Sequence, residues 1–314
     1  MIDIKKYDED TDNDIWDDLI SRSVTNLFFF KRNFLNYHKS RLEDFSLILI
    51  KKSKVIAVFP ANIMNDTIYS HAGLTFGGLI RDRKITQKDV LEIFELITTF
   101  YKAKGIKKII YKAVPYVFSK YPFQEDLYAL FSKYEAKIVK REISSIISLE
   151  NKLNFSQSKK NLVNKNNLRN KIFIKELTDY CDYWALLISV LKKRYNAKPT
   201  HSLEEITNLK SEFPDNIKLY VADKDDQILA GVVIFDFGDV VHTQYMATSD
   251  DGRKEGALDI INYELINNIY NKRKYYSFGS SCEKNGYYLN EGLINQKELM
   301  GARAIALDTY EIIL

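Results

Sequence analysis

The chain has 314 residues, a formal net charge of +4, 46% hydrophobic residues and 28% charged residues. This length can bury a sizeable core and is typical of two domains. The weak positive charge lacks the concentrated basic surface of a dedicated nucleic-acid binder. Cys181 and Cys282 are the only cysteines and have no paired spacing, which argues against a disulfide framework or a zinc site.

The amino terminus and the hydropathy of the chain bear on its location in the cell. Residues 1–16 are acidic and lack the apolar run of a signal peptide. No segment approaches the roughly 18 uninterrupted apolar residues of a spanning helix. We therefore expect a cytoplasmic protein without a transmembrane segment, with a peripheral membrane contact left open. The sequence indicates no oligomeric state.

The first half is predicted to alternate strands with helices. In chain order these are strands at 45–51 and 54–62, a short strand and loop through 79, a helix at 87–104, a strand at 106–112, a helix at 124–134 and a strand at 137–149. The helix at 87–104 has the clearest signals, because Thr86 with Asp89 resembles a helix cap and Gly105 ends it. Its apolar face consists of Val90, Phe94, Ile97 and Tyr101.

A basic, asparagine-rich segment, 152–175, lies between the two halves. Its cations are Lys159, Lys160, Lys165, Arg169, Lys171 and Lys175. Two interpretations stay open for this segment: a solvated helix that joins two domains, or a basic wall beside an anionic substrate or carrier.

The second half repeats the order of the first. Strands are predicted at 217–223, 228–236 and 240–248, followed by a helix at 256–271, a strand at 274–279, a helix at 292–300 and a strand at 303–313. The two helix-then-strand units lie roughly 170 residues apart, which argues for a duplicated α/β unit.

The turn before the central helix has the features of an anion site. The strand at 240–248 ends in a polar loop, 249–256, and the helix follows from Ala257. The first amides of a helix lack intrahelical partners, and the aligned peptide dipoles favour negative charge there. Gly256 allows a close backbone approach, and Arg253 adds a fixed positive charge. A pyrophosphate or another phosphorylated group is the expected ligand.

This turn resembles motif A of the GNAT acyltransferases, Gln/Arg-x-x-Gly-x-Gly/Ala. Arg253 and Gly256 fit the motif, whereas Leu258 departs from its small last residue. The segment 278–302, with Phe278-Gly279-Ser280-Ser281 at its start and Gly301-Ala302 at its end, is similar to the closing region of Fem-type (FemAB-like) proteins, the tandem-GNAT group. In the first half, 70–79 is similar to the glycine-bearing substrate loop of that group.

The resemblance implies an α/β (α+β) fold of two tandem GNAT-like domains, each a mixed, mostly antiparallel sheet flanked by helices. Residues 1–150 would form the acceptor side and residues 151–314 the acyl-donor side. The donor would be acetyl-CoA or another acyl-CoA, held at a splayed gap between two central strands, and no metal ion is expected. The implied donor site comprises Met246, Ala247, Thr248, Arg253, Lys254, Glu255, Gly256 and Ala257.

Three residues are candidates for proton transfer, which acyl transfer to an amine requires. His242 is one of four histidines and is either a base or a structural residue. Tyr245 either supplies the thiol proton or belongs to the core, and Glu283 is a base or a solvated loop residue. By strand alternation, His242 and Tyr245 are expected on opposite faces.

Seven further residues could line the acceptor site. They are His71, Phe76, Gly77, Gly78, Ser280, Asn285 and Lys297. The glycine pair and the Asn285-Gly286 pair could instead only turn the chain.

The favoured hypothesis is an N-acyltransferase that moves an acyl group from acyl-CoA to an amine on a small molecule or a sugar or cell-envelope precursor. The first alternative is a Fem-like aminoacyltransferase that uses charged tRNA on a cell-wall precursor, which the basic residues of 159–175 favour. The second alternative is a non-catalytic ligand- or nucleic-acid-binding protein with the same fold. The sequence contains no GxGxxG, GxxxxGK[ST], HExxH or GxSxG motif, so other common chemistries lack local support.

Overall fold

The computed structural model describes residues 1–166 and 171–314. The contacts divide the chain into two compact units: unit 1 contains 1–142, 284–288 and 306–314, and unit 2 contains 143–283 and 289–305. Two long strands, β9 (Lys137–Ser148) and β17 (Arg303–Ile313), have residues in both units. The boundary expected between residues 150 and 151 stays a prediction.

Unit 1 contains two groups of paired strands. The first group is antiparallel, in the order β1 (Ile2–Lys6), β3 (Leu47–Lys51), β4 (Lys54–Phe59) and β7 (Ile80–Arg81). The second runs β17, β8 (Lys108–Lys112), β6 (Thr67–Tyr69), β5 (Asn62–Met64) and β2 (Glu43–Asp44), and its β6–β8 pair is parallel.

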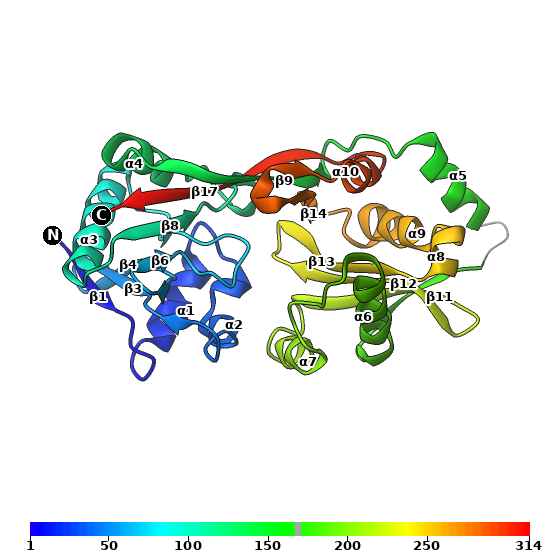
Figure 1. The fold of residues 1–314 in the computed structure, drawn as a ribbon, viewed down its shortest axis with the longest axis horizontal. Coiled ribbons are helices and arrows are strands. Elements are labelled where there is room, and N and C mark those ends of the chain that lie inside the picture. The colour runs from blue at the N-terminus through cyan, green and yellow to red at the C-terminus, as the bar shows by residue number, and fades with distance from the viewer. Residues whose placement is uncertain (167–170) are drawn as a thin grey trace. The chain divides into compact units, whose positions relative to one another are not determined.

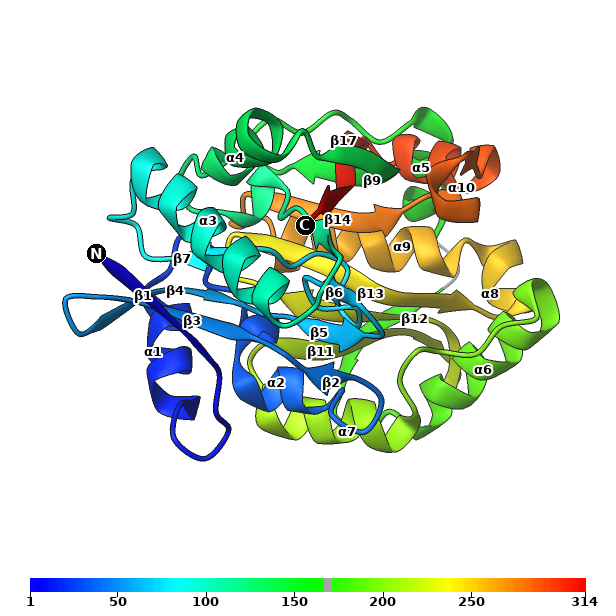
Figure 2. The same ribbon diagram turned by 60° about the vertical axis from the view of Figure 1, so that its left-hand side comes forward.

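The helices of unit 1 pack on both faces of its first strand group. Helix α1 (Asn13–Arg22) lies on one face and α3 (Gln87–Ala103) on the other (Figures 1 and 2). The predicted cap of α3 is confirmed, since Thr86 and Asp89 form a reciprocal capping box. The predicted apolar face of α3 is buried in the unit 1 core. The remaining helices are α2 (Arg32–Asn36) and α4 (Glu125–Tyr134).

Unit 2 is built on one run of strands. These are β10 (Phe173–Leu177), β11 (Ile217–Lys224), β12 (Gln227–Asp236), β13 (Val240–Thr248), β14 (Tyr275–Ser280) and the end of β9. All neighbours pair antiparallel except β13 and β14, which are parallel. A parallel pair joined through a helix therefore occurs in both units, because α3 precedes β8 as α9 precedes β14.

Two helices enclose the central strands of unit 2. Helix α6 (Cys181–Tyr195) packs on one face of β12 and β13, and α9 (Ala257–Glu264) packs on the other (Figures 1 and 2). A π-helical turn, Leu265–Ile269, extends α9. The other helices are α5 (Gln157–Lys165), α7 (Leu203–Glu212), α8 (Asp250–Glu255) and α10 (Glu291–Glu298).

The predicted fold class is confirmed as mixed α/β, while two local predictions fail. The loop expected at 249–256 is wrong, because Asp250–Glu255 form helix α8. Ser249 caps this helix by accepting a hydrogen bond from the Gly252 amide at 2.9 Å. No element was predicted for 1–44 or 176–216, where β1, α1, α2, α6 and α7 occur.

Candidate functional site

The central parallel strands of unit 2 part in the middle of β13. Among the described residues, β14 pairs with β13 only at Val240, Val241 and His242, whereas β13 continues to Thr248. Beyond His242, strand β12 still pairs with β13 on its other side. The backbone edge of β13 from Thr243 onward is therefore open to pair with a ligand. The predicted Met246, Ala247 and Thr248 lie along this open edge.

A β-bulge on β13 changes which side chains share a face. Thr243 lies opposite Ile234 and Tyr245 lies opposite Val233, so Gln244 is the extra residue. Tyr245 and His242 consequently face the same side, the side covered by α6. The predicted opposite orientation of these two residues is wrong, because simple alternation breaks down at a bulge.

His242 is a neutral imidazole at the point where the strands part. Its Nδ1 lies 3.1 Å from the Ser277 hydroxyl on the neighbouring strand. Burial, helped by the nearby positive charge of Lys297, lowers the pKa of His242 to about 4. Gly279 leaves space for the ring, since an added Cβ would lie 3.2 Å from the His242 Cε1 atom. The imidazole therefore stays uncharged at neutral pH and can exchange hydrogen bonds with a bound group.

Tyr245 is held by a histidine that the sequence analysis missed. The Tyr245 oxygen accepts a hydrogen bond from the His201 amide at 3.2 Å and lies 2.5 Å from His201 Nδ1. Trp184 of α6 packs edge-on against the Tyr245 ring, with centroids 5.2 Å apart. Burial raises the pKa of Tyr245. His201 directly precedes the capping box of α7, formed by Ser202 and Glu205, and this local signal marks the helix start but not the contact with Tyr245.

Lys297 secures the loop that follows β14. Its side chain is 2% exposed, and its ammonium donates to the Gly279 carbonyl, the Ser280 carbonyl and the Ser281 hydroxyl at 3.0, 2.8 and 2.8 Å. Burial lowers the pKa of Lys297 to about 8. All three ammonium protons therefore have acceptors within the loop, and Lys297 acts on the site by fixing Gly279 and Ser280.

Two further predicted residues, Glu283 and Asn285, follow β14 in the chain. Glu283 is exposed and accepts a hydrogen bond from Asn290 at 2.9 Å. Asn285 has a left-handed backbone conformation with φ +57° and belongs to unit 1. Neither residue has a described contact with His242, Tyr245 or His201.

The predicted diphosphate turn lies under helix α5. Gly256, with φ +71°, ends α8 and begins α9, and an added Cβ would lie 3.2 Å from Leu162. Lys159 of α5 forms an ion pair with Asp259, in the first turn of α9, at 2.6 Å. The Ala257 side chain is fully buried beneath this layer. Helix α5, which forms part of the basic segment 152–175, therefore packs on α9. Arg169 of that segment lies outside the described residues.

The two cations of this turn lie at the surface. Arg253 and Lys254 are exposed, and Lys254 pairs with Asp251 at 2.8 Å. Glu255 accepts two hydrogen bonds from Lys224, each at 2.8 Å. Arg253 is therefore the cation of this turn that a donor can reach without breaking one of these pairs.

The predicted acceptor residues of unit 1 belong to one rigid loop. Lys112 donates to the carbonyls of His71, Ala72 and Leu74 at 3.3, 3.0 and 2.7 Å. Gly77 is required where it lies, because an added Cβ would approach the Ser70 carbonyl oxygen to 2.0 Å. The remaining predicted side chains are packed: Phe76 lies against Phe29 and Phe118, and Gly78 lies against Tyr111.

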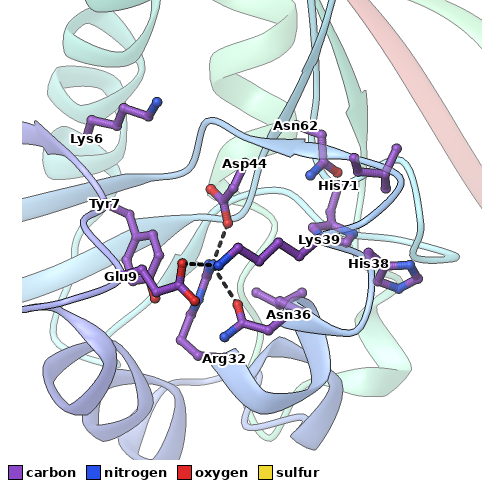
Figure 3. Close-up of a pocket in the computed structure, with 12 residues that line it drawn as sticks. Lys6, Tyr7, Glu9, Arg32, Asn36, His38, Lys39, Asp44, Asn62 and His71 are labelled. Atoms are coloured by element: carbon purple, nitrogen blue, oxygen red, sulfur yellow. Dashed lines mark hydrogen bonds and ion pairs between the residues drawn. The ribbon is translucent and has the colours of Figure 1, made fainter. Parts of the chain in front are cut away.

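His71 is the predicted residue of this loop that lines a pocket. The pocket has a volume of about 180 Å³ and also contains Arg32, His38 and Asn62 in its wall (Figure 3). His71 is 2% exposed, and burial lowers its pKa well below the usual value. The imidazole of His71 is therefore neutral at physiological pH.

Comparisons with known proteins agree with this geometry. Residues 164–287 match the acetyltransferase (GNAT) domain family. The fold is similar to that of FemX, with a TM-score of 0.69, 11% identity, and coverage of 99% of this chain and 97% of that one. Residues 164–287 thus match a GNAT domain, and the whole chain has a fold similar to those of FemX and a tandem GNAT protein.

Two further solved structures are similar to this chain in fold. The C-terminal domain of a putative lysylphosphatidylglycerol synthetase from Agrobacterium fabrum has a TM-score of 0.62 at 11% identity, covering 98% of this chain and 92% of that one. A tandem GNAT protein from the clavulanic acid biosynthesis pathway has a TM-score of 0.50 at 8% identity, covering 100% and 98%. No curated protein sequence matches this tandem GNAT chain.

Two features of the described residues concern metal ions and membranes. Within residues 1–166 and 171–314, no three His, Cys, Asp or Glu side chains gather as a metal site. In the same residues, no helix has both the length and the apolar character to cross a bilayer.

Proposed function

We propose that this protein transfers an acyl group from acyl-CoA to the amine of a small molecule or a sugar or cell-envelope precursor. The observation that carries the proposal is the parting of β13 and β14 after His242, which leaves the β13 backbone free to pair with the pantetheine arm of the donor. The thioester would then lie beside the polar side chains on the α6 face of β13. Backbone N–H groups at the open edge would stabilise the tetrahedral oxyanion.

Tyr245 and His201 would remove the proton from the attacking amine. In the proposed arrangement, His201 Nδ1 is unprotonated and accepts a hydrogen bond from the Tyr245 hydroxyl, whose oxygen also accepts one from the His201 amide. That arrangement directs the tyrosine proton away from a leaving thiolate. As the amine attacks, its proton passes to the Tyr245 oxygen while the hydroxyl proton passes to His201, and the thiolate is protonated by solvent.

His242 would bind the reacting group as a neutral partner. With a pKa of about 4, its imidazole is too weak a base to hold the amine proton at pH 7. Ser277 and the space left by Gly279 keep the ring in place at the end of the strand pairing. His242 then contributes orientation and hydrogen bonding.

A second candidate function follows from the position of α5. The first turn of α9 is closed by Leu162 and by the Lys159–Asp259 pair, so a donor diphosphate reaches it only when α5 moves. A donor that needs no diphosphate pocket at this turn, such as an aminoacyl group on charged tRNA, binds without displacing α5. The candidate is then a Fem-like aminoacyltransferase that acts on a cell-wall precursor.

Calorimetric titration with acetyl-CoA separates the two candidates. An acyl-CoA enzyme should bind the ligand with a dissociation constant below the millimolar range, and acetyl-CoA should release free thiol when an amine panel is added. Absence of binding at millimolar acetyl-CoA contradicts the first candidate. Loss of product formation after RNase treatment of an aminoacyl-tRNA preparation supports the second.

A further inference from the structure

A buried arginine in unit 1 carries more hydrogen-bonding capacity than the protein uses. Arg32 of α2 is 3% exposed, and its guanidinium lies 3.7 Å from the Tyr7 ring centroid and 4.9 Å from that of Trp16. Its Nη2 donates to Asp44 at 2.5 Å and to Asn36 at 3.3 Å. Its Nε and Nη1 atoms, both buried, have no hydrogen-bond partner.

A second unused polar atom lies in the same wall. The buried Nδ1 atom of His71 has no hydrogen-bond partner, and His71 lines the same pocket as Arg32. Buried polar groups are nearly always hydrogen-bonded in folded proteins, and exceptions gather where a ligand or another functional constraint exists. Three unused polar atoms from two residues around one pocket therefore point to a ligand that the protein binds there.

The charges of the pocket wall select the class of ligand. The residues that line the pocket include three cations, Lys6, Arg32 and Lys39, and two carboxylates, Glu9 and Asp44, which leaves one positive charge in excess. In Figure 3, Arg32 and Lys39 lie beside these carboxylates. A monoanion balances that charge, whereas a phosphate group brings up to two negative charges. The planar guanidinium also matches a carboxylate in shape. The volume of about 180 Å³ suits a molecule of amino-acid size.

The rim of the pocket can open at little cost. Lys39 and Glu9 form an ion pair at 2.5 Å, and their side chains are 64% and 46% exposed. Exposed pairs of this kind are screened by water and contribute little stability. Figure 3 shows this pair together with Asn36 and Asp44 around the end of Arg32, so a carboxylate that displaces Glu9 from Lys39 reaches the charged wall.

We propose that this pocket binds a small carboxylate of amino-acid size, with Arg32 as the main contact and Lys39 and His71 as additional partners. The site lies wholly within unit 1 and does not depend on the donor that unit 2 uses. Binding supplies acceptors to the guanidinium N–H groups that have none within the protein.

Isothermal titration of the full chain with four probes tests the proposal: propionate, L-alanine, propylamine and inorganic phosphate. Propionate or L-alanine should bind, and Arg32→Gln should weaken that binding at least tenfold. Asp44→Asn should instead tighten it, because Arg32 loses its competing carboxylate. The control Lys107→Ala, at a 79% exposed side chain outside the pocket, should leave the affinity unchanged.

The test remains decisive if Arg32→Gln fails to fold. The ¹⁵N resonance of the Arg32 Nε–H group in the unaltered protein should then shift on addition of the carboxylate and saturate at the calorimetric dissociation constant. The proposal is overturned if neither carboxylate binds, if phosphate or propylamine binds as well as they do, or if the Arg32 resonance does not move. If the protein does not bind acetyl-CoA, the proposed function is contradicted, but the results of the carboxylate titrations still stand.

Discussion

Tyr245 receives two contacts from His201, and this pairing makes a strong prediction about catalysis. Tyr245→Phe removes the proposed proton acceptor but keeps the ring that packs on Trp184. We expect kcat to fall about 100-fold or more, with little change in acetyl-CoA affinity, because general acid–base groups contribute ~10²–10⁴ in rate. His201→Phe should have a similar effect, and the double variant should lose little more, since the two residues act as one unit.

Steady-state kinetics with thiol detection measures kcat and the apparent affinity for acetyl-CoA for each variant. Fully additive losses in the double variant would contradict a single relay. An unchanged kcat for Tyr245→Phe would remove Tyr245 from the chemistry altogether.

The buried imidazole of His242 predicts how stability depends on pH. Its pKa is about 4 in the folded protein, against 6.5 for an ordinary histidine. Between these values the unfolded chain binds a proton that the folded protein does not, so stability falls as the pH falls from 6.5 to 4. Between pH 7 and pH 5, the unaltered protein should lose about 2 kcal/mol more than a His242→Asn variant.

Urea unfolding at the two pH values gives this difference directly. Asparagine keeps a polar group near the position of Nδ1 but does not titrate, so the histidine charge is isolated. If both proteins lose the same free energy of unfolding between pH 7 and pH 5, His242 is accessible to protons in the folded state.

At this scale the sequence predicts residue types better than relationships between residues. His242 and Tyr245 were identified from chemistry and position, yet their shared face depends on the bulge at Gln244. A bulge follows from how two strands pair, and the local sequence of one strand does not encode it. His201 is 44 residues from Tyr245 in sequence, so its contact becomes visible only in the folded chain.

At the scale of elements, the packing of α6 on β12 depends on one glycine. An added Cβ at Gly231 would approach the Tyr183 ring of α6 to 2.3 Å. Gly231→Ala should therefore push α6 outward and destabilise the protein by about 1–3 kcal/mol, as overpacking does. Because α6 also carries Trp184, the near-ultraviolet circular dichroism signal should change as well.

Gly292→Ala is the matched control for this substitution. Its added Cβ would meet only Asn290 Oδ1, at 3.7 Å, which is an ordinary contact. Stability should stay equal or rise slightly, since alanine favours the helix α10. Equal urea midpoints for the two variants would show that α6 adjusts without cost.

The cover formed by α5 predicts how the donor site responds to mutation. Leu162→Ala removes the side chain that lies over Gly256. If the diphosphate of acyl-CoA binds at this turn, the variant should bind acetyl-CoA several-fold more tightly, because less packing has to be broken. Asn164→Ala, at an exposed position of the same helix, should leave the affinity unchanged. Calorimetric titration with acetyl-CoA compares the unaltered protein with the two variants. Weaker binding by Leu162→Ala would show that Leu162 supports the donor site.

Elements with strong local signals were predicted well, and those that depend on distant partners were missed. The Thr86–Asp89 capping box marks the start of α3 in the sequence itself. In contrast, 249–256 contains Ser, Asp, Gly and charged residues typical of a loop, yet Ser249 caps a short helix there. Packing on α9 and the pairing of Glu255 with Lys224 stabilise that helix, and neither is a local property.

At the scale of the whole molecule, the repeated order of strands and helices predicted a tandem fold. A parallel strand pair bridged by a helix occurs in each unit. The discontinuous course of the chain was not predicted, because strand propensity does not specify the neighbour with which a strand pairs. Residues 306–314 belong to unit 1, although residues 143–283 and 289–305, which form unit 2, precede them.

Deletion of residues 306–314 tests this connectivity. In the described structure, Thr309–Ile313 of β17 pair with β8, and Ile312 is buried in the unit 1 core. Removing them leaves β8 without that neighbour and opens the core, so unit 1 should lose protection against hydrogen exchange first. We expect faster deuterium uptake in β6 and β8, while β12 and β13 stay protected. A chain with a single boundary between residues 150 and 151 would show the reverse, because its last nine residues would then support the second half.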